Sequence, residues 1–289
     1  MKQYFTTVVL IFMIFKAVAQ DKPAYVIFNS EGKKVDYSDM VKKCSKADMI
    51  FFGELHNNPI SHWLQLELTK DLYTDKQDKL ILGAEMFESD NQLVLNEYLN
   101  GSISTKSFEA ECKLWDNYVT DYKPIIEFAK LKKIPVIASN VPRRYAAMVH
   151  GKGFDVLDSL PSESKALFFN DMKKIYDENV GCYKSMMDMK EMGGHVNANF
   201  PKAQALKDAT MAYFILKYYK KDYTLIHYQG AYHSDNNEGI LWWIGKLSGN
   251  VKMATISTKE QKNIDKLDDE NKLKADFIIV TPETMTKTK

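Results

Sequence analysis

The amino-acid sequence predicts an α/β protein: a mostly parallel β-sheet flanked by helices, with a smaller helical subdomain inserted at about residues 153–200. Two observations carry this prediction. Short apolar runs recur along the chain and are separated by segments of helical periodicity, which is typical of a parallel sheet covered on both faces. The stretch 153–200 breaks this alternation, because it contains no apolar run that resembles a strand.

Six apolar runs are the expected strands. They cover residues 47–53, 79–86, 134–140, 223–230, 251–257 and 277–280. Pro59, Pro124 and Pro142 stand where helices would begin, since proline is well tolerated in the first helical turn. A small edge hairpin is expected from residues 24–29 and 34–37.

The first 20 residues have the features of a cleaved secretory signal. Lys2 precedes a short apolar stretch, and the sequence AVA at residues 17–19 is a typical cleavage site. No cysteine stands near this junction, so we expect no lipid anchor there. The mature domain, residues 21–289, is therefore expected to be exported and soluble in the periplasm or cell envelope.

The charge balance does not favour nucleic acid or an anionic membrane as a partner. Removing residues 1–20, which contain two lysines and no acid, changes the net charge from +1 to −1. Only two of the 39 basic residues are arginines, and these two, Arg143 and Arg144, are adjacent at an expected helix start. Because a guanidinium offers a planar fork to carboxylates and phosphates, this pair is a candidate anion-binding site.

Ionisable side chains follow the ends of several predicted strands. Glu54 and His56 come directly after the first strand, and Glu85 ends the second. His233 follows the fourth strand, and His62 lies in the first turns of the helix after His56. The carboxyl ends of parallel strands share one edge, so we expect these groups to converge there. They suit either a divalent metal or a metal-free acid/base pair.

Aromatic residues precede and follow the third predicted strand. Trp115, Tyr118, Tyr122 and Tyr145 could line a site for a flat apolar ligand, and a phenolate can hold ferric haem. Packing in the core is the alternative. The sequence has no GxSxG, no Gly-rich phosphate loop, no CxxC and no HExxH, which disfavours a serine hydrolase, a nucleotide enzyme and a zincin.

Five sequence blocks occur in the order found in a known family. They are FFGELHNNPISHWLQLEL, LGAEMFESDNQLVLNEYLNGSIS, LWDNYVTDYKPIIEFAKLKKIPVIASNVPRR, AQALKDATMAYFI and YQGAYHSDNNEGI. Over about residues 24–280, the chain resembles the ChaN-like family of haem-binding uptake proteins. That family belongs to a superfamily with Tiki, TraB and erythromycin-esterase-like proteins.

The resemblance implies an exported protein that binds haem and takes part in haem or iron uptake, a binding protein more than an enzyme. It implies that a tyrosine oxygen ligates the iron with help from a histidine, at a homodimer interface. Tyr118, Tyr122 and His62 are the candidates in this chain, and Arg143 and Arg144 would neutralise the haem propionates. An outer-membrane uptake receptor is an expected partner.

The same resemblance leaves two alternatives open. In metal-dependent relatives the matching positions hold a divalent ion, and here these are Glu54, His56, Glu85 and His233. The protein would then be a divalent-metal-dependent hydrolase of protease or esterase type, in which these residues are catalytic. The other alternative is an interaction module that retains an inactive pocket.

Overall fold

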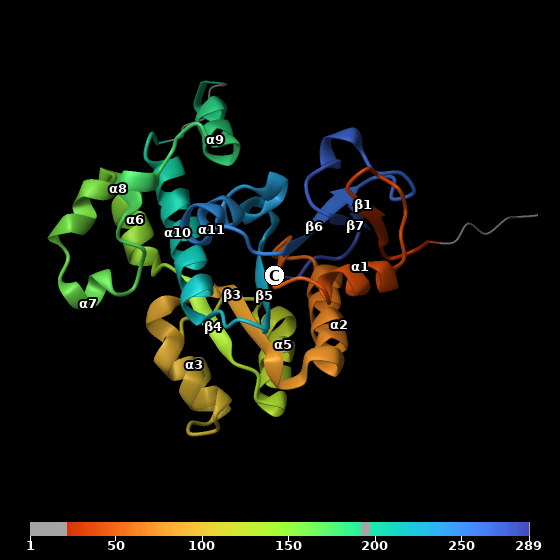
Figure 1. Ribbon diagram of the computed structural model, residues 1–289, viewed down its shortest axis with the longest axis horizontal. Helices are drawn as coiled ribbons and strands as arrows, with labels where there is room; N and C mark the ends of the chain where they lie inside the picture. The colour runs from red at the N-terminus through yellow and green to blue at the C-terminus, as the bar shows by residue number, and fades with distance from the viewer. Residues whose placement is uncertain (1–21, 192–196, 289) are drawn as a thin grey trace, which may run out of the picture.

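The computed structural model describes residues 22–191 and 197–288 (Figure 1). The expected signal peptide, residues 1–20, lies outside the described residues, as does part of the expected insertion, residues 192–196. Within the described ranges, no helix is both long and apolar enough to cross a membrane.

The described residues form a seven-stranded sheet with the strand order β1-β7-β6-β2-β5-β3-β4. The strands are β1 (Val26–Asn29), β2 (Met49–Glu54), β3 (Leu80–Glu88), β4 (Val136–Asn140), β5 (Thr224–Gly230), β6 (Met253–Gln261) and β7 (Phe277–Pro282). Every neighbouring pair is parallel except β1 with β7. The prediction of a mostly parallel sheet flanked by helices is confirmed.

Strand β2 shows why helices must cover both faces. Ile50 and Phe52 point into the core on one face, and Met49 and Phe51 point into the core on the other, because successive strand side chains alternate. The first face is covered by α1 (Tyr37–Cys44), α2 (Pro59–Lys76), α3 (Gln92–Leu99), α4 (Thr105–Glu111) and α5 (Lys123–Lys132). The second is covered by α6 (Arg143–Lys152), α10 (Phe200–Tyr218) and α11 (Ile240–Ser248).

In the described part of the expected insertion, residues 153–191 and 197–200, the regular elements before α10 are all helices. They are a 3₁₀ segment (Phe154–Ser159), α7 (Ser162–Lys165), α8 (Met172–Ile175) and α9 (Gly181–Glu191). Figure 1 shows them beside α6 and α10, on the side of the molecule away from β1. Phe154, Phe168 and Met172 pack into the same core as α6 and α10, so this segment shares a core with the sheet.

The expected edge hairpin forms only next to its turn. The Val35 amide donates to the Ile27 carbonyl oxygen at 3.0 Å, and Lys34 makes an isolated antiparallel bridge to Phe28, whereas β1 pairs along its length with β7. The second half of the expected second strand instead begins α1, where Asp36 and Asp39 form a capping box. Helix capping therefore competes successfully with strand pairing at this position.

Candidate functional site at the carboxyl edge of the sheet

Glu54 and His56 lie where β2 ends. Asn58 then caps α2, and its side-chain oxygen accepts a 3.1 Å hydrogen bond from the Ser61 amide. In the short connection, Nδ1 of His56 donates to Glu54 at 2.9 Å. Glu54 is buried, whereas 47% of the His56 side chain is exposed. The carboxylate thus fixes the ring while part of the imidazole stays accessible.

Several further side chains hold Glu54. The Tyr122 hydroxyl and the Gln65 amide each donate to it at 2.7 Å, and Nδ1 of His62 lies 3.5 Å away. Burial alone would raise the pKa of this carboxyl. The hydrogen bond from His56 and the nearby His62 ring outweigh burial and hold the pKa of Glu54 below its usual value. Glu54 is therefore a buried anion.

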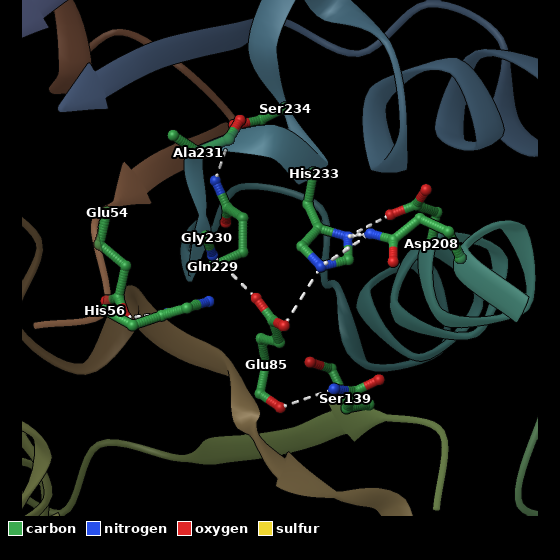
Figure 2. Close-up of polar contacts among 12 residues, drawn as sticks. Glu54, His56, Glu85, Ser139, Asp208, Gln229, Gly230, Ala231, His233 and Ser234 are labelled. Carbon is green, nitrogen blue, oxygen red and sulfur yellow. Dashed lines mark hydrogen bonds and ion pairs between the residues drawn. The ribbon is translucent and has the colours of Figure 1, made fainter. Parts of the chain in front are cut away.

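A second cluster joins Glu85, His233 and Asp208 (Figure 2). Glu85 lies in β3 where the pairing with β4 shifts register, and its Oε2 accepts from the Gly230 amide at 2.8 Å. His233 lies between Glu85, 3.2 Å from Nε2, and Asp208 of α10, which bonds to Nδ1. Burial disfavours the charged ring, but the charges of Glu85 and Asp208 outweigh it and raise the pKa of His233 to about 10.

Gly230, at the end of β5, separates the two clusters. A Cβ atom there would lie 2.9 Å from Cε1 and Nε2 of His56 and 3.6 Å from Oε2 of Glu85. The absent side chain lets the His56 ring pack directly on the strand backbone, near Glu85 (Figure 2). Burial opposes charge on this ring, but the Glu54 hydrogen bond and the Glu85 charge raise the pKa of His56. Glu54, His56, Glu85 and His233 thus lie at one rim.

These groups are arranged as ion pairs and not as an open set of metal ligands. In the described ranges, no group of three or more His, Cys, Asp or Glu side chains is placed to hold a metal ion. Both nitrogens of His233 face carboxylates, and both oxygens of Glu54 accept hydrogen bonds. A cation would have to displace these partners. The arrangement therefore does not fit the expected divalent metal.

A pocket of about 540 Å³ opens beside this rim, between α6 and α10. The strand ends contribute His56 and Glu85, α6 contributes Arg143 and His150, and α10 contributes Phe200 and Lys207. A smaller pocket of about 340 Å³ shares the wall made by His56, Trp115 and Arg143. His150, Phe200 and Lys207 were not among the site residues predicted from the sequence. The available signal was a spacing of seven residues, between Arg143 and His150 and between Phe200 and Lys207, which places both members of each pair on one face of a helix.

Tyr118 and Tyr122 lie in the core and not at the pocket. They begin and end a π-helical turn, and each is 3% exposed. The Tyr118 hydroxyl has no hydrogen-bond partner in the described part of the chain, whereas that of Tyr122 is bound to Glu54. Burial raises the pKa of both hydroxyls well above the usual value. Iron ligation by either residue would require this turn to open.

Arg144 and His62 also lie outside the pocket. Arg144 pairs with Asp90 at 2.5 Å and stacks over Tyr145, while Arg143 faces the pocket. The two arginines diverge because adjacent helical residues point about 100° apart. His62 is buried and donates from Nε2 to the His56 carbonyl oxygen at 3.1 Å. It thus supports the loop that carries His56.

The chain matches a known protein family in sequence and known structures in fold. The family model described as haem-binding uptake, Tiki superfamily, ChaN, matches residues 40–244. The structure is similar to that of ChaN of Campylobacter jejuni, which is described with cofacial haem binding. The two chains are 17% identical, and they superpose with a TM-score of 0.64 over 89% of this chain and 96% of that chain. The type III effector HopBA1 is 14% identical, with a TM-score of 0.46 over 84% of this chain and 91% of its own. No curated protein matches this chain.

The family match extends from α1 to α11, so it includes the rim, the pocket and most of the sheet. The similarity to the Campylobacter structure supports the same fold. The chain belongs to the family of haem-binding uptake proteins of the Tiki superfamily, ChaN.

Proposed function

We propose that this protein binds haem in the pocket between α6 and α10, and that it takes part in haem or iron uptake. The observation that carries the proposal is the pocket itself, in a chain of a haem-binding family. Its volume of about 540 Å³ lies in the range typical of small-molecule sites. Its wall combines Trp115 and Phe200 with Arg143, which suits a flat apolar ring that carries carboxylates.

Two imidazoles line the pocket and are candidate ligands of the iron. His56 is half exposed and oriented by Glu54, and His150 faces the pocket from the last turns of α6. Imidazole is a common axial ligand of haem iron. Ligation by Tyr118 or Tyr122 is the alternative that the family resemblance implies, and it needs the π-helical turn to move, so we favour an imidazole. His62 would support the site through the His56 backbone.

We propose a homodimer for the haem-bound form. The Campylobacter jejuni protein is described with cofacial haem, and two rings that face each other are readily supplied by two copies of one chain. Export to the periplasm and contact with an outer-membrane receptor also stay predictions. Fractionation of cells that express the full chain tests export directly.

The alternative of a divalent-metal-dependent hydrolase would place a cation among groups that already neutralise one another. Glu85 and Glu54 are paired with His233 and His56, so a cation gains less there than at unpaired carboxylates. The interaction-module alternative predicts that neither haem nor a cation binds.

The experiment that tests the proposal is absorbance spectroscopy of the protein with ferric haem, together with metal analysis of the same sample. We expect a Soret shift with a defined stoichiometry. His56→Ala and His150→Ala identify the imidazole that contacts iron, because loss of the axial ligand shifts the Soret band and the variant that keeps the ligand retains the wild-type band. A stoichiometric divalent metal that is lost in His56→Ala, with no Soret shift, would favour the hydrolase.

A further inference from the structure

Two helices present the same pattern of residues to the pocket. Helix α6 contributes Arg143, Ala146, Ala147 and His150, and α10 contributes Phe200, Ala203, Gln204 and Lys207. Both sets have the spacing i, i+3, i+4, i+7, which defines one face of a helix. Alanines occupy both middle positions of the α6 stripe and one of the two in the α10 stripe. The other middle position of α10 is Gln204, whose amide nitrogen lies 3.1 Å from the His233 ring. Three of the four middle positions are therefore small, and they leave a flat floor between the larger residues at the ends.

Protein partners neutralise the acidic groups of this pocket and pair with His56, whereas Arg143 and Lys207 have no such partner among the described residues. Glu85 is paired with His233 at 3.2 Å, and Glu88 with Lys113 at 3.1 Å. Arg143 and Lys207 form no salt bridge with any of the residues described. The pocket thus carries an excess of unpaired positive charge, which favours an anionic ligand.

The side-chain oxygen of Asn140 is a buried hydrogen-bond acceptor that has no donor among the described residues. Asn140 is buried at the end of β4 and lines the same pocket. Its amide nitrogen donates to the Glu85 carbonyl oxygen at 3.0 Å, which leaves its oxygen without a partner in the described part of the chain. A buried acceptor of this kind is costly unless a ligand or a water satisfies it. A water held by a ligand carboxylate would supply the donor.

We propose that the flat face and the carboxylates of a tetrapyrrole, more than its metal, supply the affinity of this pocket, so that it binds metal-free porphyrin as well as haem. This inference rests on the proposed haem-binding function and names the features that select the ligand. The ring packs on the alanine floor between α6 and α10. Arg143 pairs with one carboxylate in a bidentate manner, and Lys207 provides a second positive charge.

The geometry of α6 supports two separate anchoring points. Arg143 and His150 are seven residues apart, which corresponds to two helical turns and a rise of about 10 Å. His150 packs edge-on to Phe200, with 6.2 Å between ring centres, so these two rings close one end of the floor. The cation at the other end, Arg143, adjoins Trp115 and His56. The pocket is therefore apolar at one end and basic at the other.

The test measures quenching of tryptophan fluorescence by three probes: ferric haem, metal-free protoporphyrin IX and protoporphyrin IX dimethyl ester. We expect the metal-free acid to bind with a Kd within about tenfold of that of haem, and the ester at least about tenfold more weakly. Arg143→Ala and Lys207→Ala should weaken haem and the metal-free acid by the same factor, about tenfold for Arg143→Ala. Lys217→Ala, on the same helix but outside the pocket, is the matched control.

The outcomes separate the two proposals. Tight binding of haem with binding of metal-free porphyrin more than about tenfold weaker would overturn this inference, because iron ligation would then supply a large share of the affinity. Equal binding of the acid and its dimethyl ester would also overturn it. Failure of all three probes to bind would instead contradict the haem-binding function itself.

Discussion

The hydroxyl of Tyr122 donates a 2.7 Å hydrogen bond to Glu54, and both side chains are buried. The contact joins the π-helical turn before α5 to the end of β2. Glu54 in turn orients His56 at the pocket wall. A tyrosine expected to ligate iron therefore supports the pocket wall from behind, through Glu54 and His56 and through its ring contact with Trp115.

Tyr122→Phe should destabilise the fold, because it removes a donor from a buried carboxylate. A loss of about 1–3 kcal/mol in the free energy of unfolding is typical of such a change. Tyr118→Phe is the matched control, since its hydroxyl has no partner in the described part of the chain and its removal should be neutral or stabilising. Urea denaturation of both variants measures the difference. Equal destabilisation would contradict the assigned contacts.

The same two variants test ligation. We expect the Soret spectrum of the haem complex to be unchanged in both. Loss of the Soret shift in a variant that remains folded would show that the corresponding tyrosine reaches the iron, and that the π-helical turn opens when haem binds.

Gly230→Ala should displace the His56 ring, because the new Cβ would lie 2.9 Å from two of its atoms. The backbone at Gly230 has φ −56°, which alanine adopts freely, so the effect arises from the clash alone. We expect a loss of about 1–3 kcal/mol and a weaker haem complex. Gly245→Ala in α11 meets no atom within 4 Å and should be neutral or slightly stabilising. Wild-type haem affinity in Gly230→Ala would argue against a place for His56 in the pocket wall.

Arg143 and Arg144 should respond differently to replacement by alanine. Arg143 faces the pocket, and Arg144 is held by Asp90 and stacked on Tyr145. We expect Arg143→Ala to weaken haem binding, and Arg144→Ala to cost at most about 1 kcal/mol of stability with a smaller effect on haem. Titration of the two variants with haem measures this. A larger loss of affinity in Arg144→Ala would show that its side chain leaves Asp90 to contact the ligand.

His227 should make the protein less stable in mild acid. It is buried in β5, where the Gln229 amide donates to Nδ1 and Ser139 lies 2.7 Å from Nε2, and burial lowers its pKa to about 4. Between pH 6.5 and 4 the unfolded chain binds more protons than the folded one, so this contribution is present above pH 6.5 and is lost as the pH falls. The loss reaches up to about 3 kcal/mol.

Denaturation of wild type and His227→Gln at pH 7, 5.5 and 4 isolates this contribution. The variant should show a shallower loss of stability with falling pH than wild type does. Parallel pH dependence in the two proteins would mean that His227 does not titrate in this range.

The convergence of ionisable side chains at one edge of the sheet was predictable, because it depends only on the position of each residue at the end of a parallel strand. Parallel strands end at a common edge, so Glu54, His56, Glu85 and His233 had to lie near one another once the apolar runs were assigned to strands. The apolar runs also predicted that helices cover both faces of the sheet.

The partners of these residues depend on tertiary packing and were not predictable. Asp208 stands in the middle of α10, and its contact with His233 depends on the rotation and position of that helix against β5. The same is true of Gln65 and Tyr122, which reach Glu54 from α2 and from the turn before α5. Asp208 is the one acidic residue of α10 and stands among alanines, Thr and Met, and this was the available signal, since a buried carboxylate needs a partner.

Whether the pocket between α6 and α10 binds haem is best measured by an equilibrium titration of the full chain with ferric haem. We expect a saturable Soret change with one haem per chain, and a higher Kd in Arg143→Ala. A Soret change that does not saturate, or a Kd unaffected by Arg143→Ala and Gly230→Ala together, would show that haem does not bind in this pocket.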